Sequence, residues 1–334
     1  MRRRMTVASV AVTIVLASMG VAGSTAHAGS AGSGGLIAFS TGADGSDPTL
    51  TSQIFTIRPD GSGLRQATHV GAGKHALNPG FSATGKQIAF ESDVTGNFEV
   101  WVMNADGSGQ TELTKDSGFA NFHPRWSPDG ATIAFTRCTF PFGVAECHIA
   151  VIRSNGGPIT QLTSGHWADG DSCGSAPNVG SGNPVGGPEY SPDGSKIAFD
   201  SNRGGLQSAV WVMNANGSGL RRLTAPNLEA FWPDWSPRGS QIAFTTHACV
   251  PGSDIWAVRA DGTGVHALTH LPSNHNAAFE SYAPDGSRIV FTSDILDPNA
   301  ATSAIFVMNA DGSGMHSILT TQPSVLLVDW GPSG

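Results

Sequence analysis

A small set of side chains that could bind or transform a ligand occurs in a variable three-residue stretch that recurs along the chain. The set is His123, Arg125, Glu189, Trp232, Asp234 and Glu280. An imidazole, a guanidinium, carboxylates and an indole are groups that hold polar ligands or move protons. We predict that these side chains lie together and hold a polar ligand such as a sugar or a peptide end. The alternative is that they fill the interior of the fold and pair with one another.

Histidines raise a second possibility, a metal site. The candidates are His75, His123 and His275, since imidazole is the commonest protein ligand for metals. No histidine pair has a recognised spacing such as His-Glu-x-x-His, so solvated or hydrogen-bonding histidines are the alternative. Two Asp-rich stretches, residues 42–47 and 168–172, lack the complete calcium-loop pattern. We therefore name no cofactor, with calcium or another divalent metal as the alternative.

The elements that must position these side chains repeat along the chain. The stretch from Tyr190 to Thr224 reads as an inner strand end followed by three strands, from Lys196 to Ser201, Ala209 to Asn214 and Leu220 to Thr224. Pro, Asp, Asn and Gly bound these apolar runs, as in strands joined by tight turns. Six copies with a period of roughly 40–50 residues are typical of a β-propeller. The second strand of each copy starts at Leu36, Gln87, Thr132, Lys196, Gln241 and Arg288.

The two ends of the chain predict how the ring closes. The first copy begins at its second strand, while residues 326–334 match an inner strand and its turn, as in residues 233–239. A ring closed in this way leaves only short sheet edges exposed. We predict an all-β fold over residues 36–334, a six-bladed β-propeller whose first blade is completed by the strand from Leu326 to Trp330.

The repeat resembles that of the TolB-type propeller family. The shared features are a Ser-Pro-Asp-Gly turn, an Ile-Ala-Phe strand, a strand and turn as in residues 101–109, and a terminal Leu-Thr. The resemblance covers about residues 34–334 and implies the propeller fold. TolB docks envelope partners such as Pal and carries an α/β domain before its propeller. We expect no counterpart of that domain here, so TolB's own partners are not carried over.

The N-terminus has the features of a secretory leader. Arginines at positions 2–4 precede an apolar stretch over residues 7–21, and Ala26-His27-Ala28 fits the pattern of a cleavage site. We predict a signal peptide over residues 1–28 and a linker over residues 29–35; an uncleaved anchor is the alternative. Removing three arginines would lower the formal net charge from −8 to about −11. An acidic protein of this kind is a poor partner for nucleic acid or an anionic membrane.

The cysteines and the longest insertions map to the same predicted face. Cys138 and Cys147 flank one loop, and Cys173 and Cys249 lie in two others. In a secreted protein, four cysteines suggest two disulfides. We predict the pairs Cys138–Cys147 and Cys173–Cys249, the second because these two cysteines remain. Variable loops on a rigid scaffold commonly carry binding residues, although passive loops are the alternative.

Motifs for several enzyme classes are missing from the sequence. The one Gly-x-Ser-x-Gly string, residues 170–174, lies in an insertion between two predicted blades and not between a strand and a helix as in a nucleophile elbow, and there is no phosphate-binding loop. These observations favour a secreted monomer, extracellular or periplasmic, that binds an envelope or extracellular protein or glycan and does not insert into the membrane. The alternative is a metal-assisted polysaccharide lyase or hydrolase with a histidine-lined site on the same face, because some metal-using lyases have similar repeats. A purely structural envelope protein is a third possibility, since propellers host many functions.

Overall fold

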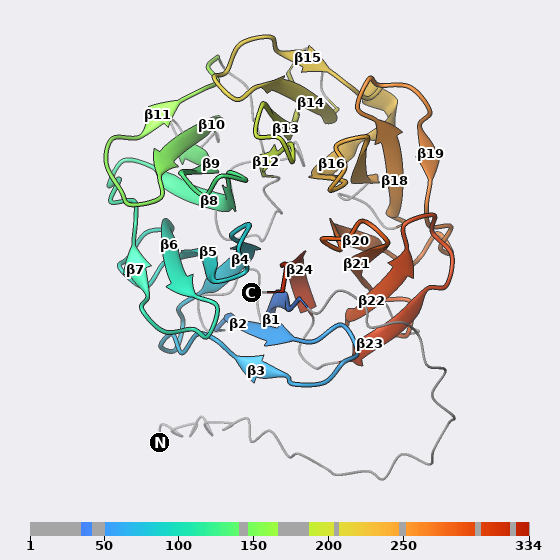
Figure 1. Cartoon of the computed structure of the whole chain (residues 1–334), viewed down its shortest axis with the longest axis horizontal. Coiled ribbons are helices and arrows are strands. Elements are labelled where there is room, and N and C mark those ends of the chain that lie inside the picture. Colours follow the sequence, from blue (N-terminus) through green and yellow to red (C-terminus); the bar gives the residue numbers. More distant parts are fainter. Residues whose placement is uncertain are drawn as a thin grey trace, which may run out of the picture. The chain divides into compact units, whose positions relative to one another are not determined.

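The fold was examined in a computed structural model. It describes residues 35–41, 51–139, 146–165, 187–203, 207–246, 252–297, 302–320 and 325–333. All of them lie in one compact unit, Ser33–Gly334. They form six four-stranded antiparallel sheets around a central axis (Figure 1). The predicted all-β, six-bladed propeller is therefore confirmed, while the predicted signal peptide and most of the linker lie outside the described residues.

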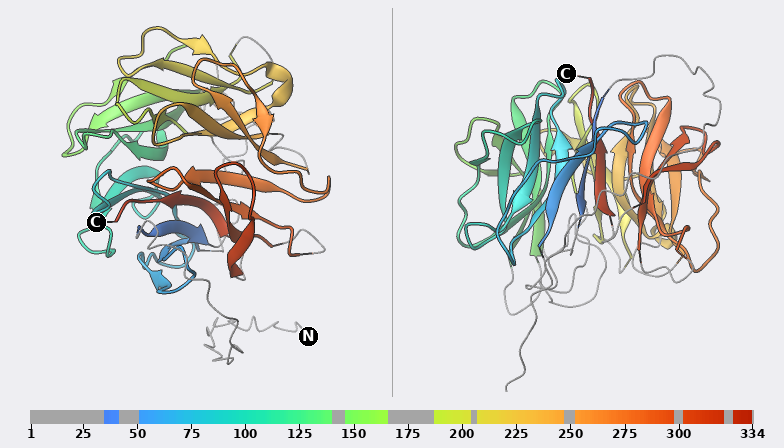
Figure 2. Two further views of the ribbon diagram at one scale, coloured as in Figure 1. Left: turned by 45° about the vertical axis from the view of Figure 1, so that its right-hand side comes forward. Right: turned by 90° about the horizontal axis from the view of Figure 1, so that it is seen from below.

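Each sheet is one blade, and its first strand in the order below lies nearest the axis (Figure 1). Blades 1 to 3 contain β24 (Val325–Trp330), β1 (Ile37–Thr41), β2 (Gln53–Ile57), β3 (Arg65–Gln66); β4 (Ala76–Phe81), β5 (Gln87–Ser92), β6 (Glu99–Asn104), β7 (Thr111–Glu112); β8 (Ala120–Trp126), β9 (Thr132–Thr139), β10 (Glu146–Arg153) and β11 (Thr160–Gln161). Blades 4 to 6 contain β12 (Glu189–Tyr190), β13 (Lys196–Ser201), β14 (Ala209–Asn214), β15 (Arg221–Arg222); β16 (Ala230–Trp235), β17 (Gln241–Thr246), β18 (Asp254–Arg259), β19 (His266–Ala267); β20 (Ala277–Tyr282), β21 (Arg288–Ser293), β22 (Ala304–Asn309) and β23 (His316–Thr320). Seen edge-on, the strands run from one face of the ring towards the other (Figure 2).

Blade 1 is closed by the last strand of the chain. β24 pairs antiparallel with β1, so that Trp330 lies opposite Ile37 and Val328 opposite Phe39. Trp330 is only 4% exposed and packs in a cluster that joins blades 1 and 6. The ends of the chain are thus joined in one sheet, as the sequence predicted.

The core lies between neighbouring blades. The phenylalanine of each second strand is buried, and the residues that share this position are Phe39, Phe90, Phe135, Phe199, Phe244 and Phe291. In the cluster around Phe291, Ala243 and Ile255 of blade 5 pack with Ile289 and Phe306 of blade 6. Burial of one large apolar face by the next blade explains why the repeat keeps an aromatic residue here.

The turn aspartates have a local structural role. Asp106 Oδ1 accepts a hydrogen bond from the backbone N–H of Ser108, and Asp193 Oδ1 does the same for Ser195. The hydrogen bond from the Ser191 hydroxyl, together with those from Ser195, lowers the pKa of Asp193 to about 2. These carboxylates therefore cap their own turns.

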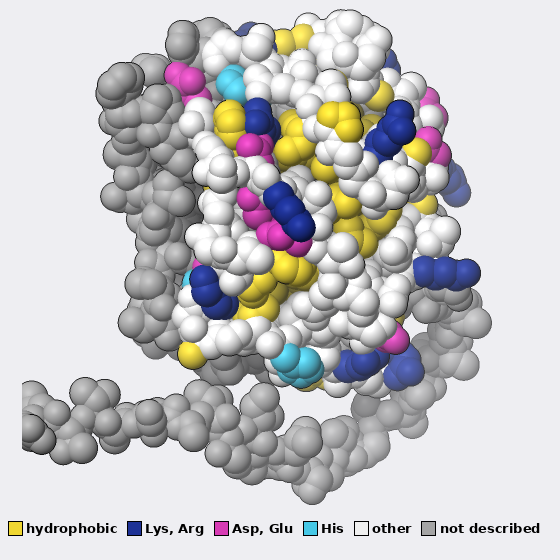
Figure 3. Space-filling view, turned by 90° about the vertical axis from the view of Figure 1, so that its left-hand side faces the viewer, with side chains coloured by type: hydrophobic (Ala, Val, Ile, Leu, Met, Phe, Trp, Pro, Cys, Tyr) yellow, Lys and Arg dark blue, Asp and Glu magenta, His cyan; other side chains and the backbone are white. Residues whose placement is uncertain are grey.

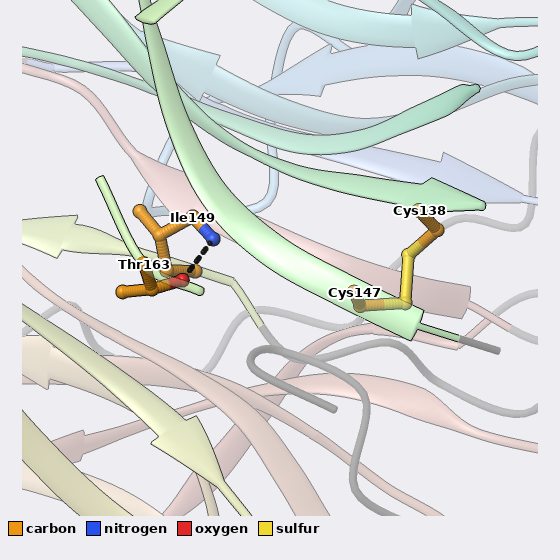
Figure 4. Close-up of a disulfide and its surroundings, with 4 residues drawn as sticks. All are labelled: Cys138, Cys147, Ile149 and Thr163. Carbon is orange, nitrogen blue, oxygen red and sulfur yellow. Dashed lines mark hydrogen bonds between the residues drawn. A yellow bond between two sulfur atoms is a disulfide. The ribbon is translucent and has the colours of Figure 1, made fainter. Parts of the chain in front are cut away.

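A disulfide joins the central strands of blade 3. Cys138 on β9 and Cys147 on β10 lie directly opposite each other, with an S–S distance of 2.02 Å (Figure 4). This pairing is confirmed. Cys173 and Cys249 lie outside the described residues, as do large parts of the insertions between Ser164 and Gly187 and between Cys249 and Ser253, so the second pairing stays a prediction.

We expect the variant Cys138→Ala/Cys147→Ala to fold but to unfold at a lower temperature. The bond closes a loop with a sequence separation of 9, and a loop of that size contributes about 2–3 kcal/mol by restricting the unfolded chain. In a domain of this size the expected decrease in Tm is roughly 5 °C. Thermal unfolding of the variant and the unmodified chain without reductant measures this decrease, and equal Tm values would contradict it.

Candidate functional site

The six predicted ligand residues line one pocket in the central channel. They come from four inner strands: β8 supplies His123 and Arg125, β12 supplies Glu189, β16 supplies Trp232 and Asp234, and β20 supplies Glu280. The remaining lining residues are Gly187, Pro188, Pro233, Phe279, Ser281, Leu327, Val328 and Asp329. The pocket has a cavity volume of about 30 Å³ and is partly open to solvent. The structure thus brings the predicted residues together, while their ligand-binding role stays a prediction.

An irregularity in the inner strands sets the direction of these side chains. The pairing register shifts between Phe122 and Arg125 in β8 and between Phe231 and Asp234 in β16. Within these shifts, His123 and Trp232 have φ values of 50° and 48°, a region that bulky residues rarely adopt. The same shift and a positive φ recur at Asn78, Phe279 and Leu327 in other inner strands, so the bulge is a property of the repeat, and bulges of this kind re-aim side chains.

Two glycines provide the space for His123 and Arg125. A Cβ added at Gly187 would lie 2.6 Å from the Cβ of His123. A Cβ added at Gly80 would lie 2.9 Å from the Pro124 carbonyl oxygen and 3.1 Å from Nη1 of Arg125. Both glycines occupy the inner-strand stretch that varies between the blades. Because a glycine has no side chain, it leaves room for His123 or Arg125 of the neighbouring blade.

The pocket contains more acidic than basic groups. Arg125 Nε lies 3.1 Å from Glu189 Oε2, so the arginine is already paired. This contact agrees in part with the alternative that the side chains pair with one another. Asp234, Glu280 and Asp329 add three further carboxyl groups to the lining. Arg125 is the one cationic side chain among the lining residues that the structure describes.

Two of these aspartates also join neighbouring blades. Asp234 Oδ2 of blade 5 accepts a hydrogen bond of 2.8 Å from the backbone N–H of Tyr282 in blade 6. Asp329 Oδ2 of blade 1 accepts an equivalent bond of 2.8 Å from Phe81 in blade 2. Between blades 6 and 1, the Ser281 hydroxyl accepts the N–H of Trp330 at 3.2 Å. One carboxylate oxygen of each aspartate is therefore committed to the fold.

Burial shifts the pKa of each acid towards its neutral form. Desolvation raises the pKa of Glu280 to about 8 and that of Asp234 to about 7. Desolvation, followed by repulsion from Asp234, raises the pKa of Glu189 well above its usual value. Burial also raises the pKa of Asp329. The pKa of His123 is lowered well below its usual value, chiefly by burial, so its imidazole is neutral at pH 7.

Some buried polar atoms in the pocket have no hydrogen-bond partner among the described residues. His123 is 3% exposed, and neither Nδ1 nor Nε2 has a hydrogen-bond partner among the described residues. Its backbone N–H donates to Glu91 Oε2 at 2.6 Å. Glu280 is 5% exposed: Oε2 accepts the Thr245 hydroxyl at 2.7 Å, whereas Oε1 has no partner among the described residues. A buried polar atom without a partner costs about 1–3 kcal/mol, which a bound ligand can offset.

One side of the pocket is aromatic. The rings of Trp232 and Phe279 lie 4.4 Å apart between centroids, and Phe231 packs against Trp232 at 5.8 Å. Trp232 is 8% exposed. The pocket therefore combines acidic groups and a neutral imidazole with a π surface.

The three histidines proposed as metal ligands lie in different environments. His75 Nδ1 lies 3.1 Å from the Ser52 hydroxyl oxygen, and its ring stacks on Phe98. His275 Nδ1 lies 3.2 Å from Asp294 Oδ1, whereas His123 lines the channel pocket. Within the described part of the chain, no three His, Cys, Asp or Glu residues are arranged to hold a metal ion. The structure thus does not assemble a metal centre from these histidines.

Sequence reasoning did not select Asp329 or Phe279, although both line the pocket. Asp329 belongs to the strand that closes blade 1, and this role obscured its position beside the channel. The alignment of Val-Asp-Trp at residues 328–330 with Pro-Asp-Trp at residues 233–235 could have identified Asp329, because Asp234 was already a candidate. Phe279 directly precedes Glu280, but its aromatic ring alone did not distinguish it from core residues.

The outer surface seen from the side of β7 and β11 differs from the channel. Acidic and basic side chains lie next to one another on this side (Figure 3), and the ion pairs of this region include Arg137–Asp116 at 2.6 Å and Lys115–Glu112 at 4.0 Å. Among the described residues, no helix is long and apolar enough to cross a membrane.

Comparisons with known proteins agree with this architecture. Residues 179–334 match the family described as "TolB beta propeller domain". The Tol-Pal system protein TolB of Anaeromyxobacter dehalogenans strain 2CP-C is 30% identical over 176 residues, which cover 52% of this chain and 35% of that protein. The chain thus matches about a third of this relative's length.

Two solved structures show the same fold at low sequence identity. TolB from Acinetobacter baumannii is similar with a TM-score of 0.70 and 18% identity, over 90% of this chain and 67% of that one. A putative TolB from Agrobacterium tumefaciens is similar with a TM-score of 0.61 and 19% identity, over 90% and 92% of the two chains. The fold and its channel define a six-bladed β-propeller. The resemblance to the TolB-type propeller is confirmed for residues 179–334, which match that domain.

Proposed function

We propose that this protein is a binding module that acts outside the cytoplasm and engages an envelope or extracellular protein or glycan through its channel pocket and the adjoining loops. The observation that carries the proposal is the pair of buried, unpartnered groups in the pocket. Both ring nitrogens of His123 and Oε1 of Glu280 are buried without a hydrogen-bond partner among the described residues. A ligand that supplies these partners would stabilise the site.

The disulfide supports the proposed location. Disulfides form and persist in oxidising compartments and are rare in the cytosol, and Cys138–Cys147 is buried within a strand pair. Together with the N-terminal pattern of a secretory leader, it favours export of the chain to the periplasm or the exterior. Among the described residues, no three His, Cys, Asp or Glu side chains are grouped so that they could hold a metal ion.

The proposal predicts that one captured ligand depends on the pocket. The full chain, expressed with its own leader and immobilised, would be exposed to envelope and culture fractions, and bound proteins or glycans would be identified and titrated. We expect His123→Ala to weaken binding by at least about tenfold, because a ligand loses about 1.4 kcal/mol or more with a buried hydrogen bond. Gly187→Ala should have a similar effect, because the new Cβ would displace His123.

Gly71→Ala is the matched control, because nothing lies within 4 Å of a Cβ added there. Thermal unfolding of each variant separates lost binding from lost folding. A ligand that binds all variants equally would place the binding surface elsewhere. Absence of any retained ligand would contradict the binding role.

A further inference from the structure

We propose that the channel pocket takes a primary ammonium group at the end of an alkyl chain, as in a lysine side chain of a partner protein. This inference rests on the proposed binding function and names the chemical group that the pocket selects. It follows from the charges, the unpartnered atoms and the aromatic surface that meet in the pocket.

Acidic groups outnumber cationic groups in the pocket, so a second cation would stabilise their ionised forms. Glu189, Asp234, Glu280 and Asp329 line it together with a single guanidinium, that of Arg125. This guanidinium is held by Glu189 at 3.1 Å, and the carboxyl groups of Glu189, Asp234 and Asp329 repel one another. An ammonium group would reduce that repulsion where water has limited access and charges interact more strongly than in bulk.

The unpartnered atoms match the donors of an ammonium group. An ammonium has three N–H donors and no acceptor. Once Glu280 is ionised, its Oε1 is an acceptor without a partner among the described residues, and a neutral His123 offers one ring nitrogen as an acceptor. Both side chains are more than nine-tenths buried and line the pocket. Hydrogen bonds from an ammonium to these atoms would be charge-assisted and therefore strong.

The remaining lining favours an organic cation over a metal ion. Trp232 and Phe279 line the pocket, and a cation placed above an aromatic face gains about 0.5–2 kcal/mol. Leu327, Val328 and Pro188 offer apolar surface for an alkyl stem. In contrast, the described residues contain no set of three ligands suited to a metal, and one oxygen each of Asp234 and Asp329 is bonded to a backbone N–H.

Binding should release a proton and therefore strengthen as the pH rises. The titratable and charged groups facing the pocket are His123 and Arg125 from β8, Glu189 from β12, Asp234 from β16, Glu280 from β20 and Asp329 from β24, with Glu91 of β5 behind His123. An ammonium stabilises the ionised carboxylates, so acids that are protonated in the free pocket lose a proton on binding. Where one proton is released, affinity rises about tenfold per pH unit.

The test measures binding of n-butylammonium chloride to the full chain by calorimetry at pH 6, 7 and 8, with n-butanol as the neutral isostere. Nα-acetyl-lysine methylamide, glucosamine and calcium chloride are tested in parallel. We expect n-butylammonium and the lysine derivative to bind, n-butanol not to bind, and affinity to increase between pH 6 and 8. Glu280→Gln should weaken n-butylammonium binding by about tenfold or more, and Trp232→Leu by a few-fold.

Asp329→Asn is a second variant that removes an acid from the pocket. It keeps the contact between blades, because an asparagine oxygen can still accept the N–H of Phe81. Glu112→Gln, on the outer strand β7, is the matched control and should bind as the unmodified chain does. Equal binding of n-butanol would overturn the proposal in favour of an apolar site, and binding of calcium without n-butylammonium would overturn it in favour of a metal site. Binding of glucosamine without the lysine derivative, or binding of none of the probes, would also overturn it.

The two proposals fail in different ways. If a captured protein depends on His123 but binds equally well after its lysines are acetylated, the ammonium proposal is wrong and the binding function stands. If no captured ligand responds to His123→Ala, the proposed function itself is wrong, whatever the small amines do.

Discussion

Deleting residues 325–334 is expected to abolish the cooperative fold. This deletion removes β24, whose buried Val325, Val328 and Trp330 pack in the cluster shared by blades 1 and 6. It would also expose the edge of β1, which pairs with β24 in the closed ring. Truncating one buried Trp to Ala costs about 3–5 kcal/mol, compared with a total stability of about 5–15 kcal/mol for most domains, so the loss of the whole strand exceeds what the ring can tolerate.

Circular dichroism during heating, together with size-exclusion chromatography, measures this effect. The truncated chain should show no cooperative transition and should aggregate, because a free strand edge readily pairs with other chains. Trp330→Ala is a milder variant that should still fold with a clearly reduced Tm. The control deletes residues 333–334, of which Ser333 is exposed, and should leave the Tm unchanged. A cooperative transition in the longer truncation at the original temperature would show that β24 does not hold the ring closed.

Stability is expected to fall as the pH rises from about 6.5 to 8.5. Burial raises the pKa of Glu280 to about 8 and the pKa values of Asp234 and Glu91 to about 7. The folded state therefore binds more protons than the unfolded chain, whose carboxyl groups have pKa values near 4. The contribution of these acids is complete below the unfolded pKa and is lost as the pH rises through the folded pKa.

His123 acts in the opposite direction at lower pH. Its folded pKa is depressed, so its contribution is present above about pH 6.5 and is lost as the pH falls towards the folded pKa. The acids are therefore observed most cleanly above pH 6.5. In that window, each acid that is protonated in the folded state and ionised in the unfolded chain lowers the free energy of unfolding by up to about 1.4 kcal/mol per pH unit.

Urea unfolding at pH 6.5, 7.5 and 8.5 tests the sign and the assignment. Glu280→Gln resembles the protonated acid, so this variant should lose about 1–2 kcal/mol less stability over the window than the unmodified chain. Glu112→Gln on β7 serves as the control and should follow the unmodified chain. A free energy of unfolding that rises with pH, or a slope unaffected by Glu280→Gln, would contradict the buried-acid explanation.

The sequence predicted the strands closely because the repeat supplies six copies of the same evidence. The second strand of blade 4 was expected from Lys196 to Ser201 and the third from Ala209 to Asn214, and both match β13 and β14. Outer strands were predicted too long: the stretch from Leu220 to Thr224 contains only the pair Arg221–Arg222 in β15. The length of an outer strand depends on the neighbouring turns, and a short apolar pattern does not predict where those turns end the pairing.

The composition of the pocket was predictable only in part. Residues at corresponding repeat positions converge on the axis, so His123, Glu189 and Asp234 could be grouped from the sequence. The positive φ of His123 and the hydrogen bond from Tyr282 to Asp234 could not be predicted, because they depend on how one inner strand packs against the next. The pKa shifts were equally hidden, since they follow from burial that only the assembled ring produces.

The bonds of Asp234 and Asp329 to the next blade restrict how this pocket can diversify. Each aspartate both lines the pocket and accepts a backbone N–H from the next blade, so a substitution that removes this acceptor changes the pocket and also weakens the contact between blades. The imidazole of His123 makes no hydrogen bond to a neighbouring blade among the described residues. New ligand preferences should therefore arise more readily at the repeat position of His123 than two residues further along the strand, and designed libraries should vary the first position and keep the second constant.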